Sequence, residues 1–150
     1  MENSFLLTVI ASLPLSVSAF ADNEATGIIK QRMDHFKASQ MALKQIFAVS
    51  KRNKFEAIVP LANQIKSWVE IEPTKFPTGS DRPPFEAAPA IRKDFEGFKL
   101  AAKENFEAAS FLEVTALDGD AKAPAKSINQ LAGTCKSYHQ SYRSNQSLMS

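Results

Sequence analysis

The segment GTCKSYHQSYR, residues 133–143, carries the residues whose types and spacing are best suited to chemistry. It contains Cys135, the single cysteine of the chain, and His139, one of its two histidines. Cys-x-x-Cys-His is the attachment motif of c-type haem, and here Tyr138 stands at the second cysteine position. Residues four apart share one face of a helix, so Cys135 and His139 can point into one site. There, a thioether would hold the edge of a haem and the imidazole would bind its iron.

Tyr138 limits that chemistry, because a phenol hydroxyl does not add to a vinyl group as a thiol does. At most one covalent link survives, through Cys135. Three states are open: haem held by one thioether, haem held only by His139 and packing, or no haem. Tyrosine is also far larger than cysteine, and in a close-packed interior its volume displaces neighbouring side chains or the haem edge. Taken alone, the Cys-x-x-x-His spacing is more readily explained by a buried thiol beside a surface imidazole.

The chain offers few other groups for metal or acid–base chemistry. A zinc site at Cys135, His139 and His35 is short of ligands, because structural zinc takes four. The acidic residues show no paired arrangement typical of acid–base catalysis, and no serine, histidine and carboxylate set indicates a hydrolase. We therefore do not expect an enzyme.

The length of 150 residues suits one domain. Residues 1–21 resemble a secretory signal, with an apolar run over residues 5–10 and the small-residue pattern Ala19-Phe20-Ala21, so we expect export to the periplasm. The run is too short to span a membrane, which leaves residues 22–150 as a domain free of the membrane. Cleavage removes one acidic residue, Glu2, and raises the formal charge from +2 to +3. These charges are scattered, which argues against nucleic-acid binding.

Hydrophobic periodicity predicts four helices and no strand. They cover about residues 23–52, 55–71, 93–117 and 124–144, with a proline-rich irregular connection between the second and third. Short links make neighbouring helices antiparallel, so we expect an all-α, up-down-up-down four-helix bundle. On the first helix, the residues expected to face inward are Ile29, Arg32 or Met33, Phe36, Gln40, Leu43 and Phe47.

Four segments, in order along the chain, resemble the cytochrome c′ family. IIKQRMDHFK resembles its opening Arg-x-x-x-Met/Leu/Phe-Lys pattern, and FPTGSD resembles Phe-Pro-x-Gly-Ser-Asp. APAIRKDFEGFK is similar to the entry to its third helix, with Arg92 where tryptophan is usual. GTCKSYHQSYR resembles Gly-x-x-Cys-Lys-x-Cys-His-x-x-Phe/Tyr-Arg. The resemblance covers about residues 28–143.

This resemblance implies a four-helix bundle that holds haem near its C-terminal end. His139 would be the proximal iron ligand, and Cys135 would match the first thioether cysteine. Arg32 would lie near a haem propionate and Arg143 near the proximal face. Phe36 would cover the distal face without a donor atom; Met33 is a rival sixth ligand, although a core position is the simpler interpretation.

The function implied is electron transfer, or binding of nitric oxide or carbon monoxide at five-coordinate iron, with redox partner proteins and a possible homodimer through the first two helices. The alternative, suggested by Tyr138, is a haem-free bundle that uses the same scaffold for binding or partner contact. An empty cleft of that kind would collapse, fill with aromatic rings or take another apolar ligand.

Overall fold

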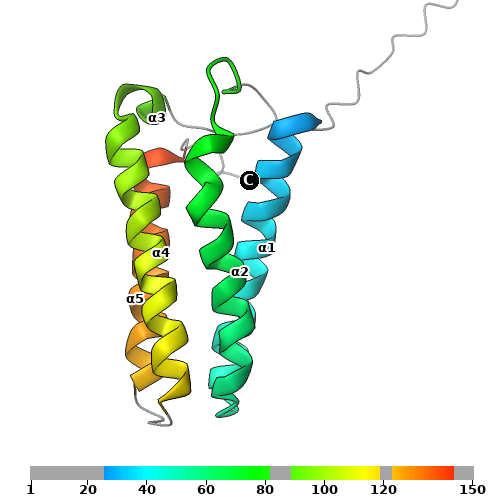
Figure 1. Ribbon diagram of the computed structural model, residues 1–150, viewed down its shortest axis with the longest axis vertical. Helices are drawn as coiled ribbons and strands as arrows, with labels where there is room; N and C mark the ends of the chain where they lie inside the picture. The colour runs from blue at the N-terminus through cyan, green and yellow to red at the C-terminus, as the bar shows by residue number, and fades with distance from the viewer. Residues whose placement is uncertain (1–25, 82–88, 119–122, 144–150) are drawn as a thin grey trace, which may run out of the picture.

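The computed structural model describes residues 26–81, 89–118 and 123–143, and every regular element in these ranges is helical (Figure 1). In chain order the elements are α1 (Gly27–Ser50), η1 (Phe55–Ala57), α2 (Ile58–Ile71), η2 (Glu72–Lys75), α3 (Ala90–Lys93), α4 (Phe95–Leu117) and α5 (Ala123–Tyr142). The prediction of an all-α fold is confirmed. The proposed signal, residues 1–21, lies outside the described residues.

The four long helices run alternately in opposite directions. In Figure 1, α1 runs down, α2 returns, α4 runs down and α5 returns. Helices α2 and α4 pack extensively, as do α4 and α5, whereas α1 and α5 meet over a much smaller area. The start of α1, the end of α2 and the end of α5 therefore lie at the same end of the bundle. Of the neighbouring long helices, α1 and α5 make the fewest contacts with each other.

Local signals explain where the helices begin and end. Pro60 is the third residue of α2, in the first turn, where a missing backbone N–H breaks no helical hydrogen bond. Asp94 separates α3 from α4 and caps α4, because its side chain accepts a hydrogen bond from the Gly97 N–H at 3.0 Å. The third long helix thus begins at Phe95 rather than at the predicted Lys93. The connection predicted to be irregular contains two short helical segments, η2 and α3.

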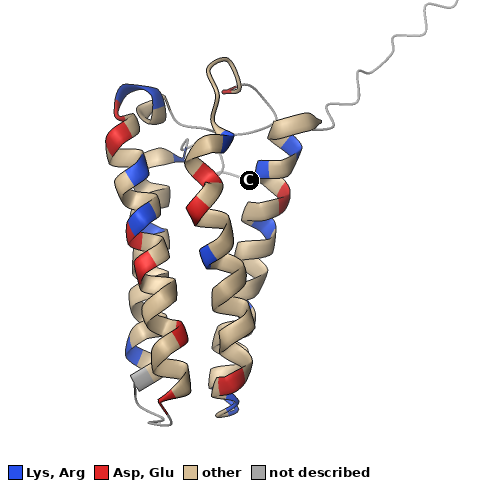
Figure 2. Ribbon diagram, viewed as in Figure 1, with Lys and Arg blue, Asp and Glu red and all other residues tan. Residues whose placement is uncertain are grey.

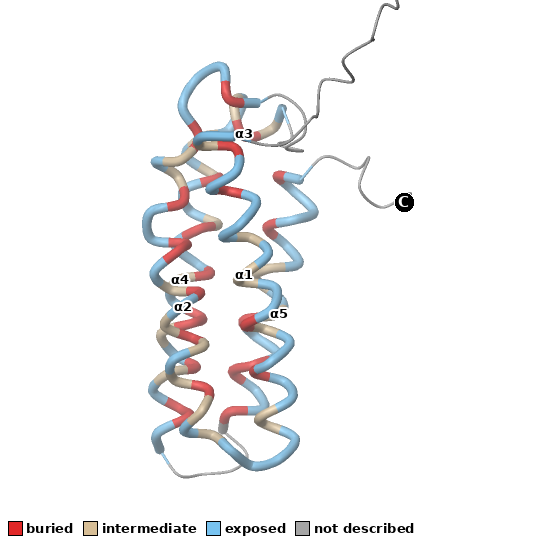
Figure 3. Tube along the Cα trace, turned by 90° about the vertical axis from the view of Figure 1, so that its right-hand side faces the viewer, coloured by how far each residue is buried: buried red, intermediate tan, exposed pale blue. Residues whose placement is uncertain are grey.

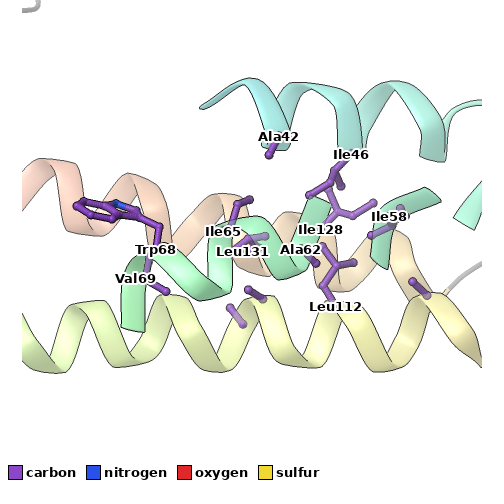
Figure 4. Close-up of a cluster of buried hydrophobic side chains, with 13 residues drawn as sticks. Ala42, Ile46, Ile58, Ala62, Ile65, Trp68, Val69, Leu112, Ile128 and Leu131 are labelled. Atoms are coloured by element: carbon purple, nitrogen blue, oxygen red, sulfur yellow. The ribbon is translucent and has the colours of Figure 1, made fainter. Parts of the chain in front are cut away.

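The apolar core fills the interior along the length of the bundle (Figure 3). Its main cluster, shown in Figure 4, comprises Ala42, Ile46, Ile58, Ala62, Ile65, Trp68, Val69, Ala108, Ala109, Leu112, Ala116, Ile128 and Leu131. On α2, α4 and α5 the members of this cluster recur at steps of three and four, which is the periodicity on which the prediction of helices rests.

The predicted inward face of α1 is partly wrong. Ala42 and Ile46 are buried, whereas Phe47 is 37% exposed and Leu43 is only half-buried. Neighbouring residues on a helix are about 100° apart, so the true core stripe lies one residue before the predicted one. The larger side chains at 43 and 47 misled the periodicity argument, because α1 carries apolar residues on more than one face.

In the view of Figure 2, residues of both charge signs occur along the helices. Within the described ranges, none of the helices combines the length and the apolar character needed to cross a membrane.

The loop FPTGSD is held in place by Arg92. The Arg92 guanidinium bonds both carboxylate oxygens of Asp81 at 2.6 Å and donates to the carbonyls of Phe76 and Pro77, each at 2.7 Å. Gly79 in this loop has φ +83°, a left-handed backbone conformation that favours glycine. Arg92 therefore anchors this loop through hydrogen bonds to the Asp81 carboxylate and to two backbone carbonyls.

Arg92→Ala is expected to lower the free energy of unfolding by about 1–3 kcal/mol, because a bidentate ion pair and two carbonyl bonds are lost. The pKa of Asp81, which the Arg92 hydrogen bond holds below its usual value, should rise in the variant. Urea unfolding measures the first effect. Arg52→Ala is the control, because Arg52 is exposed and bonds the Ala48 carbonyl within its own helix. Equal losses in both variants would contradict this role of Arg92.

Candidate functional site: a cleft between α1, α2 and α5

A cleft of about 620 Å³ opens where α1 and α5 diverge. Its walls come mainly from α1, α2 and α5, and its volume is in the range of small-molecule and cofactor sites. The predicted site residues that line it are Phe36, Cys135, Tyr138, His139 and Arg143, together with the rival ligand Met33. The fold thus brings together side chains from both ends of the sequence.

His139 lies at the edge of this cleft on α5. The His139 side chain is exposed to solvent, but the surrounding protein atoms partly desolvate its ring. This desolvation, and next the positive charge of Arg143, lower the pKa of the imidazole. The imidazole is therefore neutral at pH 7 and keeps a lone pair for a metal. The His139 and Phe36 rings face each other edge to face across the cleft, with centroids 6.4 Å apart.

Cys135 is half-buried one helical turn before His139 and lines the same cleft. Burial, and next the negative charge of Glu72, raise the pKa of its thiol to about 11. At neutral pH the group is therefore a protonated thiol. A thiol is oxidised less readily than a thiolate. The spacing argument from the sequence therefore correctly placed Cys135 and His139 beside one cavity.

Tyr138 turns from α5 into an aromatic cluster at the wall of the cleft. This cluster comprises Phe76, Ile91, Phe98, Tyr138 and Tyr142. The Tyr138 ring is 6% exposed and lies 5.6 Å from the Phe98 ring, centroid to centroid. Its hydroxyl donates a hydrogen bond to Oε1 of Glu72. The phenol therefore borders the cleft, and its polar end is directed to a buried carboxyl.

Glu72 is a site residue that the sequence analysis missed. It is 1% exposed, lines the cleft, and has its pKa raised to about 8 by burial, with the Tyr138 hydrogen bond acting in the opposite direction. A signal was present: Glu72 follows Ile65 and Trp68 at steps of three and four, which continues the inward face of α2. A carboxyl in that stripe needs a buried hydrogen-bond partner.

Phe36, Met33 and His35 occupy different environments on α1. Phe36 is half-buried and packs edge-on against Trp68, with centroids 5.5 Å apart. Met33 lines the cleft but is exposed. His35 does not line it; its exposed ring stacks on Trp68 at 4.5 Å. Among the described residues, no three His, Cys, Asp or Glu side chains gather as a metal site of their own.

Arg32 lies away from the cleft wall. Its fully buried guanidinium donates to the Ser80 hydroxyl at 3.1 Å and to the Ser80 carbonyl at 2.5 Å, and lies 4.5 Å from the centre of the Phe76 ring. Arg143 lines the cleft beside His139, whose carbonyl accepts its backbone N–H at 3.1 Å. The structure thus places Arg143 at the site and ties Arg32 to the loop FPTGSD.

Comparisons with known proteins identify the family of this chain. The sequence model described as Cytochrome C' matches residues 27–143. The chain belongs to the cytochrome c′ family. Cytochrome c′ of Rhodospirillum rubrum is 30% identical over 150 residues, which cover 95% of this chain and 99% of that relative. Cytochrome c′ of Cereibacter sphaeroides is 25% identical over 95% of this chain and 98% of its own length.

Solved cytochrome c′ structures share the fold. The structure from Thermochromatium tepidum has a TM-score of 0.71 at 21% identity, over 79% of this chain and 95% of that chain. The one from Rhodopseudomonas palustris has a TM-score of 0.70 at 24% identity, over 81% and 99%. The prediction of a four-helix bundle of cytochrome c′ type is confirmed.

Cytochrome c′ proteins bind c-type haem, and the residues of this cleft fit such a group. A neutral imidazole and a thiol one turn apart border one largely apolar cavity, which is the donor set that axial ligation and a single thioether need. Phe36 and His139 are in contact, so a planar group between them requires the two rings to part. The exposed position of His139 allows this by rotation of its side chain.

Proposed function

We propose that this cytochrome c′ family member is a periplasmic haem protein that transfers electrons or binds nitric oxide or carbon monoxide. In this proposal His139 is the proximal iron ligand and Cys135 forms the one thioether. The observation that carries it is the position of both side chains on a single face of α5, lining one cleft opposite Phe36.

The haem would supply the redox-active, ligand-binding iron, and the protein would determine what reaches it. His139 offers a neutral nitrogen, because burial and Arg143 disfavour its charged form. Phe36 has no donor atom, so it would cover the haem across the cleft from His139 without binding the iron. An apolar cover of this kind favours carbon monoxide and nitric oxide over oxygen, whose bound form gains from a hydrogen-bond donor. Arg143 is the candidate partner for a haem carboxylate because it lines the cleft, whereas the buried Arg32, for which the family resemblance implies the same role, bonds Ser80 instead.

Partner and location are part of the same proposal. We expect residues 1–21 to direct export and to be removed after Ala21. One solved relative is described as having ligand-controlled dimer dissociation. A homodimer of this chain through α1 and α2 is supported by the exposed apolar side chains of Met33, Met41 and Phe47 on α1.

A haem-free binding protein remains the second candidate, because one observation favours it. Tyr138 stands where the second haem-attachment cysteine is expected, and its buried ring forms part of the cleft wall. A maturation system that requires two cysteines would not attach haem to this chain. The cleft would then take a different apolar ligand or close through its aromatic rings.

Acid–acetone extraction of the purified protein separates these candidates. The chain is expressed with its signal in a host that matures c-type cytochromes, and the visible spectrum is recorded before and after extraction. We expect a Soret band that survives, because a thioether to Cys135 resists extraction. In Cys135→Ser the band should be lost on extraction. A wild-type protein without a Soret band under ample haem supply would contradict the haem proposal.

Tyr138→Cys is the matched control for the number of links, since it completes a Cys-x-x-Cys-His motif at the same position. The haem of Tyr138→Cys should also resist extraction. This variant should carry one thioether more than the wild type, which the mass of its haem peptide and its haemochrome spectrum would show. If this variant carries haem and the wild type does not, the haem-free candidate is favoured.

A further inference from the structure

Tyr138 lies at a boundary between two environments. On one side its ring contacts the aromatic cluster, including Phe98 at 5.6 Å and Tyr142 at 5.8 Å between centroids. On the other side it borders the cleft, where the rings of His139 and Phe36 lie 5.8 Å and 6.3 Å away. A rotation about the Tyr138 side-chain bonds toward His139 would therefore place a phenol inside the cleft.

The Glu72 carboxyl is the polar group that holds the ring on the cluster side. Glu72 lies at the junction of α2 and η2, 66 residues before Tyr138 in the sequence. Its carboxyl accepts a buried hydrogen bond from the Tyr138 hydroxyl. This is the one side-chain hydrogen bond found for Glu72 within the described parts of the chain. If the ring turned into the cleft, both the hydroxyl and the buried carboxyl would lose their partner, which carries a large penalty.

Burial of Glu72 is itself unfavourable, since the site raises its pKa to about 8 and an apolar residue of similar size would fill the same space without that cost. A carboxyl at such a position stabilises the fold poorly, but it selects one orientation of its partner well. A side chain in a helix has two common χ1 rotamers, and a single strong hydrogen bond is enough to choose between them.

We propose that Glu72 is a positioning residue that keeps the Tyr138 ring out of the cleft and so keeps the cleft open for the haem. The inference rests on the proposed function for its consequence, but the ring position is a property of the protein alone. It explains how a tyrosine occupies an anchor position without filling the cofactor site.

The test is a double-mutant cycle on the full mature chain, titrated with haemin and followed by the Soret band. Glu72→Leu should lower the haemin affinity about tenfold or more, because the ring is released toward His139. Glu72→Gln keeps an acceptor and should bind nearly as wild type does. In a Tyr138→Ala background, where there is no ring to release, Glu72→Leu should change the affinity less than about twofold.

A purely structural role would give a different pattern. Glu72→Leu replaces a buried carboxyl by an apolar side chain of similar volume, so it should fold. The Tyr138 hydroxyl loses its acceptor in this variant and turns toward the cleft, so the variant should bind less haemin. Glu113→Leu is the matched control: its carboxylate also bonds across helices, to Lys66 and Asn63, but it does not line the cleft. Equal haemin affinity in wild type and Glu72→Leu, or an effect of Glu72→Leu that persists in Tyr138→Ala, would overturn the proposal.

An NMR measurement separates this inference from the proposed function. Nuclear Overhauser contacts between the Tyr138 and Phe98 rings should be present in the wild type and lost in Glu72→Leu. If the wild type binds no haemin, the proposed function fails, and these contacts still decide the role of Glu72. Unchanged Tyr138–Phe98 contacts in Glu72→Leu would overturn it.

Discussion

Replacement of His139 by alanine is expected to abolish or radically change the iron spectrum of the haem-loaded protein. The imidazole is the neutral nitrogen donor on α5 that lines the cleft, and it lies one turn after the thiol that would anchor the haem. Loss of the axial bond leaves the iron to water or to a surrogate ligand, so the Soret maximum should shift and the carbon monoxide complex should change its spectrum. Haem content by extraction and visible spectra of both oxidation states measure the effect.

His35→Ala is the matched control, because His35 is the other histidine, is exposed and does not line the cleft. It should leave the iron spectrum as in wild type. Addition of imidazole to His139→Ala should restore much of the original spectrum, since the cavity left by the side chain admits the free ligand. An iron spectrum that is the same in wild type and His139→Ala would remove the proposed ligand role.

A second large effect is expected from pH, through Glu72. Its folded pKa of about 8 lies above the ordinary value of 4.5 because the carboxyl is buried. Between these two values the folded state holds a proton that the unfolded state has lost, so the free energy of unfolding falls as pH rises through this window. At 1.36 kcal/mol per pKa unit, the titration of Glu72 lowers the free energy of unfolding by about 3–4 kcal/mol between pH 5 and pH 8.

Urea unfolding at pH 5 to 8 measures this slope, and Glu72→Gln isolates it, because the amide does not titrate in this range. His139 acts in the opposite sense: its folded pKa is lowered, so its contribution to stability rises with pH up to about the ordinary value of 6.5. The difference between wild type and Glu72→Gln removes that contribution from the comparison. A difference that stays constant from pH 5 to 8 would show that Glu72 titrates normally and is not buried as described.

Much of the fold is predictable from the sequence, because it depends on local periodicity. The buried residues of α2, α4 and α5 recur at steps of three and four, and α2 and α4 end at residues 71 and 117 as predicted. On α1 the same method fails by one residue, since Met33, Met41 and Phe47 are apolar yet exposed. When a helix carries apolar residues on several faces, packing against the neighbouring helices decides which of these residues are buried.

The sequence by itself determined that Cys135 and His139 share a helix face, that the chain resembles a haem-binding bundle, and that the second anchor is replaced by Tyr138. These follow from spacing along one helix and from motifs in order. Tertiary structure alone decided that Tyr138 meets Glu72, that Arg32 bonds Ser80, and that Arg92 holds the loop of Asp81. The physical reason is that such bonds join distant segments, and their direction depends on how helices pack, which no local pattern records.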